Sequence, residues 1–198
     1  MGAAHKLGLV SVEDYLAREL RSETKHEYLG GIIHAMAGAT NNHNTIALNT
    51  ATSLRTKLRG KKCRPFNADT KVRVRLPTQI RFYYPDVSIV CHPNAPEESF
   101  QDAPAVIVEV FSRSTRRTDM GEKKDAYLTI PTLSVYLLVE QDEPAVVAYR
   151  RTNDGFVREV YEGLDAVIHL PEIETELALS DVYEDVTFTP EPDENDMS

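Results

Sequence analysis

The sequence predicts an α/β fold in which a mixed central β-sheet is flanked by helices. Segments with helical periodicity, over residues 11–23, 41–58 and 118–129, alternate with short runs rich in β-branched and aromatic residues. One of these runs, residues 104–112, is apolar on almost all of both faces, which is typical of a central strand covered on two sides. The order of elements therefore indicates one sheet with helices packed against it.

The N-terminal third is predicted to contain two helices and a hairpin. Ser11 begins a pattern that resembles a capping box, so the first helix is expected over 11–23. Residues 25–36 are expected to form two short strands around Gly30-Gly31, a hairpin turn signal. The second helix is predicted from 41 to 58 and ends near a glycine.

The remaining elements are mostly strands. Pro131 ends the third predicted helix, because proline cannot continue a helical hydrogen-bond ladder. Strands are predicted at 62–76, 81–92, 104–112, 133–140, 144–151 and 155–161.

Composition indicates one domain over residues 1–188 and a tail over 189–198. The tail is acidic and has almost no apolar content to bury in a core, which predicts disorder. Cys63 and Cys91 are too few to frame a disulfide scaffold or a zinc cluster, which favours a cytoplasmic location. No stretch approaches the roughly 18 apolar residues of a membrane span, so a membrane is not an expected partner.

Charge is divided unevenly along the chain. The total is −9, but every one of the 22 Lys and Arg residues lies at or before Arg158, and 13 of the 31 acidic residues lie after it. Residues 1–158 therefore carry +4 and residues 159–198 carry −13. Nine cations lie within residues 55–75, opposed only by Asp69. This basic stripe is expected either to bind a phosphate backbone or to balance the acidic C-terminal region. Its first six cations, the candidate nucleic-acid contacts, are Arg55, Lys57, Arg59, Lys61, Lys62 and Arg64.

Glu109 lies inside the apolar run PAVIVEVFS. Side chains alternate along a strand, so Glu109 shares one face with Ile107 and Phe111, while three valines occupy the other face. A buried carboxylate needs a cationic partner. Arg113 or Arg116 would supply a purely structural salt bridge.

Asp86 and Lys123 are candidates for the same site as Glu109. Asp86 precedes the apolar run VSIV, although Pro-Asp is also a common turn dipeptide. Lys123 is four residues from both Asp119 and Tyr127, so the three side chains share one helical face. Two carboxylates and a lysine that converge in apolar surroundings indicate a metal-dependent hydrolytic site.

These motifs carry a resemblance to a known family. The segments YYPDVSIV and VIVEVFSRST, with the D-x-x-x-K-x-x-x-Y pattern, resemble the Uma-two family of bacterial restriction endonucleases, assigned to the PD-(D/E)XK nuclease superfamily. Upstream, KHEYLGGIIHAMAGATNNHN is similar to that family's hairpin and following helix. The resemblance covers about residues 11–151 and implies a restriction-endonuclease-like core.

The resemblance also implies a mechanism. Asp86 and Glu109 would hold Mg²⁺, or Mn²⁺ as a substitute, against the scissile phosphate of DNA, and a lysine would help to activate the attacking water. Mg²⁺ prefers one or two carboxylates with waters and phosphate oxygens, which suits this pair. Their separation of 23 positions leaves room for a strand, a loop and a second strand.

The sequence departs from the superfamily pattern at the lysine. Phe111 occupies the position two residues after Glu109 where the superfamily has lysine. A family variant places the lysine on the next helix, where its spacing favours Lys123 over Lys124.

Other family positions are less decisive. The family's Glu-Tyr-Trp segment is replaced by SVYLLVE, with Tyr136 and no Trp in the chain. Glu27 is either a further acidic member of the site or a partner of Lys25. His43 is either a proton shuttle or DNA contact, or a residue that caps or packs at the start of its helix.

The predicted function is that of a Mg²⁺-dependent DNA endonuclease that hydrolyses phosphodiester bonds. Asp86, Glu109 and Lys123 would be catalytic, supported by Asp119 and Tyr127. Two alternatives remain: a nuclease-fold protein that binds DNA through the basic stripe without cleaving it, and a protein-interaction module that acts through its acidic C-terminus. A homodimer would supply the two cuts that duplex cleavage needs.

Overall fold

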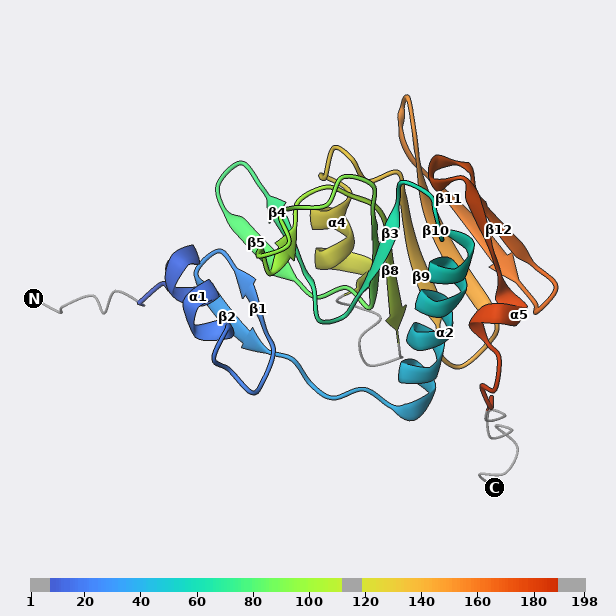
Figure 1. Cartoon of the computed structure of the whole chain (residues 1–198), viewed down its shortest axis with the longest axis horizontal. Helices are drawn as coiled ribbons and strands as arrows, with labels where there is room; N and C mark the ends of the chain where they lie inside the picture. Colours follow the sequence, from blue (N-terminus) through green and yellow to red (C-terminus); the bar gives the residue numbers. More distant parts are fainter. Residues whose placement is uncertain (1–7, 112–118, 189–198) are drawn as a thin grey trace, which may run out of the picture.

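Two β-sheets and the helices around them form the framework of the chain (Figure 1). The computed structural model describes residues 8–111 and 119–188. Both sheets combine antiparallel pairs with one parallel pair, so the predicted mixed α/β architecture is confirmed. The predicted single domain over 1–188 stays a prediction, and the predicted disordered tail lies outside the described residues.

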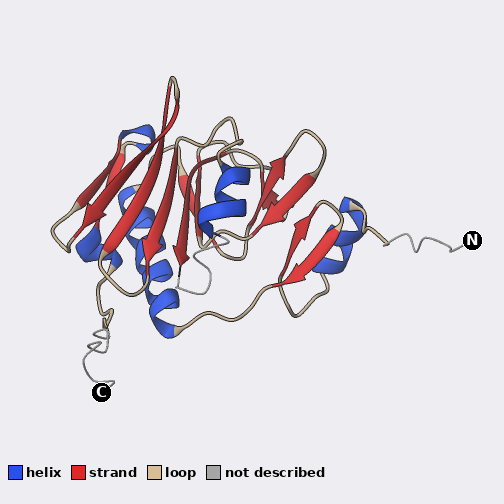
Figure 2. Cartoon of the chain, turned by 180° about the vertical axis from the view of Figure 1, so that it is seen from behind, coloured by secondary structure: helices blue, strands red, loops and turns tan. Residues whose placement is uncertain are grey.

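The first sheet has the strand order β2-β1-β5-β4-β7. Its strands are β1 (His26–Leu29), β2 (Ile32–Ala35), β4 (Lys71–Arg75), β5 (Ile80–Tyr83) and β7 (Phe100–Gln101). Helix α1 (Val12–Glu19) packs on it through Tyr15, which contacts the rings of Tyr28 and Phe82. Ser11 caps this helix by accepting the Asp14 N–H, so the predicted first helix and hairpin are both present (Figure 2).

The second sheet has the order β11-β10-β9-β8-β6-β3. Its strands are β3 (Arg64–Asn67), β6 (Val87–Val90), β8 (Pro104–Phe111), β9 (Val135–Glu140), β10 (Ala145–Thr152) and β11 (Gly155–Glu162). A third sheet contains β12 (Val167–Leu170) and β13 (Thr175–Ala178), which are joined by the short helix η2 (Pro171–Ile173) and followed by α5 (Leu179–Val182). The sequence patterns had not predicted these C-terminal elements.

Strand β8 is buried on both faces, as its alternation predicted. On one face, Val108 lies in a core with Ile46 and Leu54 of helix α2 (Asn41–Lys57). On the other face, Phe111 lies in a core with Tyr127. Full burial of each such side chain contributes roughly 1.5–3 kcal/mol, so β8 is held firmly between two layers.

The third predicted helix is present in two parts. The described chain resumes in a π-helix, η1 (Asp119–Lys123), which continues into α4 (Lys124–Tyr127) and ends before Pro131. This short unit covers the face of β8 opposite α2 (Figures 1 and 2). It therefore brings its side chains toward Glu109.

Two predicted strands are each divided between the two sheets. The predicted strand 62–76 is broken by a turn, so that β3 joins the second sheet and β4 the first. The predicted strand 81–92 is interrupted around Pro85, which has no N–H to donate to a ladder. Asp86 therefore lies where the chain passes from one sheet to the other.

A disulfide joins Cys63 to Cys91. It links the residue before β3 to the residue after β6, which pair antiparallel. The count of cysteines did not indicate this bond, because the pairing depends on the return of β6 alongside β3. Within the described ranges, no helix is long and apolar enough to cross a membrane.

Candidate active site

Asp86 directly precedes strand β6, and Glu109 lies on the neighbouring strand β8. These strands pair antiparallel, with Val87 opposite Val108. The main-chain N–H of Val110 donates to Asp86 Oδ2 at 2.7 Å. Asp86 therefore contacts the main chain directly after Glu109, the other carboxylate that the sequence predicts as a metal ligand.

Lys123 reaches this pair from η1. Its Nζ lies 3.0 Å from Glu27 Oε1 and 3.6 Å from Glu109 Oε1. All three side chains are largely buried, so the ion pairs form in a medium that screens charge weakly. The neighbouring Lys124 points elsewhere, with its Nζ 5.3 Å from the centroid of the Tyr149 ring. The spacing argument that preferred Lys123 agrees with this geometry.

Tyr127 supports Glu109 directly. Its hydroxyl donates to Glu109 Oε1 at 3.0 Å, and its ring is fully buried. Burial and the nearby charge of Glu109 raise the pKa of Tyr127 well above its usual value. The phenol therefore remains a hydrogen-bond donor throughout the neutral range.

Glu27 belongs to this cluster rather than to Lys25. Lys25 pairs instead with Asp69, at 2.5 Å. The sequence left open whether Glu27 joins the site or pairs with Lys25, and the structure places Glu27 against Lys123. Asp119 opens η1, but its side chain lies outside the described part of the chain, as do Arg113 and Arg116.

His43 contacts Asp86 from the first turn of α2. Its Nε2 lies 3.3 Å from Asp86 Oδ2. The cap of this helix is Thr40, whose hydroxyl accepts the main-chain N–H of His43. The imidazole is therefore placed against the carboxylate and does not cap the helix.

Two residues that the sequence analysis did not single out hold the lysine in place. The centroid of the Tyr83 ring is 5.9 Å from Lys123 Nζ, within the range of a cation–π contact. Arg81 donates to the Tyr83 hydroxyl at 2.9 Å and to Glu122 Oε1 at 2.8 Å. Arg81 therefore connects β5 to the residue next to Lys123. The only sequence signal was the spacing of Arg81 and Tyr83 on one face of a strand.

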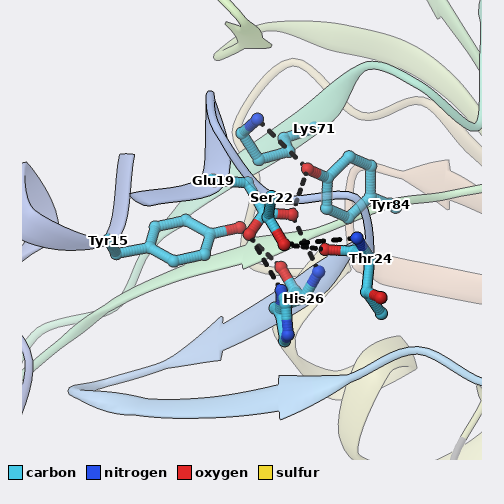
Figure 3. Close-up of polar contacts among 7 residues, drawn as sticks. All are labelled: Tyr15, Glu19, Ser22, Thr24, His26, Lys71 and Tyr84. Carbon is cyan, nitrogen blue, oxygen red and sulfur yellow. Dashed lines mark hydrogen bonds and ion pairs between the residues drawn. The ribbon is translucent and has the colours of Figure 1, made fainter. Parts of the chain in front are cut away.

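A second polar cluster fixes the strands that lead to the site (Figure 3). Glu19 accepts hydrogen bonds from the His26 main chain at 2.8 Å and from the Tyr84 hydroxyl at 2.8 Å. Lys71 is 4% exposed and donates to the same hydroxyl at 3.2 Å. Burial lowers the pKa of Lys71 and raises that of Tyr84.

This second cluster lies close to the catalytic candidates in sequence. His26 directly precedes Glu27, and Tyr84 is two residues before Asp86. The contacts of Glu19 thus connect α1 to the two segments that lead to Glu27 and to Asp86. No motif indicated them, because they join residues from elements that are distant in the chain.

The basic stripe divides into two groups. Lys57 pairs with Asp181 at 2.9 Å, and Lys61 donates to the main-chain oxygen of Glu174. The other four cations of its first part line a hollow at the C-terminal end of α2: Arg55, Arg59, Lys62 and Arg64. His43 is at the opposite end of that helix, about 21 Å from Lys57 at 1.5 Å per residue. The stripe therefore does not adjoin the carboxylates.

The residues at the site suit a hard divalent cation. In the described ranges, no group of three or more His, Cys, Asp or Glu side chains has a geometry that could hold a metal. Mg²⁺ does not need such a cage, because it binds through one or two carboxylates and keeps several waters. Both described contacts of Asp86 use Oδ2. The oxygen donors of Asp86 and Glu109 fit Mg²⁺ or Mn²⁺ better than thiolate-preferring metals.

Comparison of the sequence with known protein families identifies the family of this chain. The model of the Uma2 family, described as "Putative restriction endonuclease", matches residues 12–181. The chain belongs to the Uma2 family. The resemblance inferred from the sequence motifs is thereby confirmed, and membership of Uma2 supports a nuclease-like function.

Two relatives come from Synechocystis sp. (strain ATCC 27184 / PCC 6803 / Kazusa). "Uncharacterized protein slr1290" is 37% identical over 147 residues, which cover 74% of this chain and 76% of the relative. "Uncharacterized protein sll1609" is 30% identical over 149 residues, which cover 74% of this chain and 83% of the relative.

A solved structure shares the fold of this Uma2 chain. It is the crystal structure of "a putative nuclease belonging to DUF820" from Anabaena variabilis ATCC 29413. The TM-score is 0.69 at 19% identity, with 88% of this chain and 97% of that chain covered. The match supports the predicted fold class.

Proposed function

We propose that the chain is a divalent-metal-dependent endonuclease that hydrolyses phosphodiester bonds of DNA at Asp86, Glu109 and Lys123. The observation that supports this most is the position of Lys123. Phe111 occupies the usual lysine position, yet the Lys123 ammonium from η1 lies 3.0 Å from Glu27 and 3.6 Å from Glu109. A helix-borne lysine can therefore take the place of the missing strand lysine.

Asp86 and Glu109 are the proposed ligands of Mg²⁺, with Mn²⁺ as a substitute. Such an ion, when bound, lowers the pKa of a coordinated water and offsets the charge that builds on the phosphoryl oxygens. The Val110 N–H and His43 would orient Asp86, while the Tyr127 hydroxyl would orient Glu109. These contacts restrict both carboxylates before any ligand arrives.

Lys123 would contribute a fixed positive charge. Its pairing with Glu27 and its contact with the Tyr83 ring hold the ammonium beside Glu109. A charge held in place stabilises the developing negative charge of the transition state without the cost of reorganisation. Glu27 in this scheme positions the lysine and does not bind the metal.

DNA as the substrate, a homodimer that makes two cuts, and a cytoplasmic location all stay predictions. The basic stripe remains the candidate surface for the DNA backbone. Its distance from Asp86 and Glu109 means that its cations would contact a phosphate other than the one being cleaved.

The decisive test compares two adjacent lysines. Lys123→Ala and Lys124→Ala remove the same charge from consecutive positions, but only Lys123 lies against the carboxylates. Plasmid and linear DNA are incubated with each purified protein and Mg²⁺ or Mn²⁺. We expect Lys123→Ala to lose about 10²–10³-fold in cleavage rate, the usual effect of removing one transition-state charge contact. Lys124→Ala should retain the wild-type rate. Equal rates in the two variants would remove Lys123 from the mechanism.

The metal ligands are tested separately by binding. Mn²⁺ titration, followed by electron paramagnetic resonance, measures ion affinity without any cleavage. Asp86→Asn and Glu109→Gln should each weaken Mn²⁺ binding at least tenfold. Asp102 pairs with Arg73 elsewhere, so Asp102→Asn should leave Mn²⁺ binding unchanged. Binding that is unchanged in both site variants would refute the assignment. Wild-type protein that binds DNA and never cleaves it would favour the non-cleaving alternative.

A further inference from the structure

One continuous part of this acidic protein has no acidic residues. The chain contains 31 Asp and Glu residues, but none lies between Glu27 and Asp69. Helix α2 lies wholly within this span. Its exposed positions run along one stripe that carries only amide, hydroxyl, aliphatic and cationic side chains: Asn41, Asn44, Leu48, Thr52, Arg55 and Thr56. A polyanion can approach this stripe without meeting a carboxylate on the helix.

The stripe ends at a hollow of about 250 Å³ lined by Arg55, Arg59, Lys62 and Arg64. Within the described residues, none of these four cations forms an ion pair. Four like charges around one concavity repel one another, and a bound anion relieves that repulsion. Lys61 also lines the hollow but is held by the main chain of Glu174.

Helix electrostatics alone do not explain these residues. Cations in the last turn of a helix offset its dipole, and this accounts for Arg55 and Lys57. It does not account for Lys62 and Arg64, which follow the helix and lead into β3. The four side chains converge because the chain reverses at Gly60 after the helix ends.

We propose that this hollow, the distal phosphate pocket, binds a backbone phosphate of the DNA whose cleavage is proposed at Asp86 and Glu109. This inference rests on the proposed function. From His43, beside Asp86, to Lys57 at the end of α2, next to the hollow, is about 21 Å. Duplex DNA rises 3.4 Å per base pair, so the two sites are about six base pairs apart. The pocket would therefore set a minimum length for tight binding.

A double variant tests the pocket. Arg59→Ala with Lys62→Ala removes two cations of the hollow, and Arg158→Ala with Lys124→Ala is the matched control with the same charge change. Affinity for a 20-base-pair duplex is measured at several salt concentrations in EDTA, which prevents cleavage. We expect the slope of log K against log salt to become shallower by about 0.9 for each DNA phosphate that the double variant no longer neutralises. The control pair should keep the wild-type slope.

Duplex length supplies the second readout. For wild type, affinity should rise steeply once the duplex exceeds about seven base pairs, beyond the gradual rise expected from additional binding positions. For the double variant this step should disappear. Equal slopes and equal length profiles in the double variant and the control would overturn the inference, as would wild type that does not bind duplex at all.

The same chemistry could come from a small phosphate-bearing ligand. Inorganic phosphate and pyrophosphate are therefore titrated by calorimetry against wild type and the double variant. Submillimolar binding that depends on Arg59 and Lys62, without a length step for DNA, would identify a small ligand and overturn the backbone assignment. Failure of the proposed function is distinguishable from failure of this inference. The first appears as absence of cleavage by wild type with Mg²⁺ or Mn²⁺, whether or not the length step in affinity is seen.

Discussion

Lys123 and Tyr127 approach the same oxygen of Glu109 from one short helical unit. The ammonium lies 3.6 Å from Oε1 and the phenol donates to it at 3.0 Å. One is a charge and the other a neutral donor, since burial keeps the phenol protonated. Their roles are therefore separable by mutation.

We expect Tyr127→Phe to weaken the site without removing it. Loss of a hydrogen bond to a buried carboxylate should lower the free energy of unfolding by about 1.5–3 kcal/mol. Cleavage should fall about tenfold, equivalent to about 1.4 kcal/mol, because Lys123 remains beside Glu109. Urea unfolding and initial cleavage rates check both numbers. Tyr28→Phe is the control, because its hydroxyl donates to the Val10 carbonyl, away from the carboxylates. It should lose stability and retain activity.

The residues of the site were predictable to different degrees. Spacing and resemblance pointed to Asp86, Glu109 and Lys123, because motif and helical period are local properties of the sequence. The contacts of Arg81 and Tyr83 with η1 could not be predicted from the sequence, because they depend on where β5 lies relative to η1. Such relations between distant segments leave no trace in either segment alone.

At the scale of elements, the π-helix η1 determines where Lys123 points. It turns directly into α4, and its residue Glu122 is the one held by Arg81 of β5. A π-helical turn changes the direction in which the side chains of the following helix point. One ion pair on this turn can therefore fix the neighbouring side chains. The Arg81–Glu122 pair is therefore expected to set the position of the lysine.

We predict that Glu122→Gln lowers the cleavage rate about three- to tenfold and leaves Mn²⁺ affinity unchanged. The reason is that the proposed metal ligands lie directly before β6 and on β8, while the loosened element carries only the lysine. An exposed pair contributes at most about 1 kcal/mol, so folding should be nearly unaffected. Asp125→Asn is the matched control from the same unit, with a 76% exposed side chain. A fall in Mn²⁺ affinity for Glu122→Gln would contradict this division of roles.

Element types were predictable, but their assembly was not. Helices 11–23 and 41–58 and the hairpin follow from period, capping and turn signals, which are short-range. The division of the predicted strands 62–76 and 81–92 between two sheets does not. The prolines and turns that break them are visible in the sequence, but the choice of pairing partner depends on long-range packing.

At the scale of the whole molecule, buried tyrosines carry a collective dependence on pH. Burial is the largest cause that raises the pKa in each of four cases: Tyr15, Tyr84, Tyr127 and Tyr183. Tyr15, Tyr127 and Tyr183 lie in three different hydrophobic clusters, and Tyr84 follows β5, so their titration reports on the entire fold. Sequence alone identified none of them as titrating groups, because burial is a property of the assembled layers.

These tyrosines predict alkaline unfolding. Unfolded phenols ionise near pH 10, whereas the folded ones retain their protons. Above pH 10 the folded state therefore binds more protons, and the free energy of unfolding falls by about 1.4 kcal/mol per pH unit for each such tyrosine. The stabilisation is complete below pH 10 and is lost as pH rises toward the raised pKa values. Lys71 acts in the opposite sense below about pH 10.5, because burial lowers its pKa.

Urea unfolding from pH 8 to 11.5 measures this slope. Tyr183→Phe removes one phenol, whose hydroxyl donates to the Glu140 carbonyl. It should be less stable than wild type at pH 8, because that bond is lost. Its stability should then decline with pH less steeply above pH 10.5, by about 1.4 kcal/mol per unit. Identical slopes for Tyr183→Phe and wild type would show that the Tyr183 phenol ionises equally in both states, contrary to the effect expected of its burial.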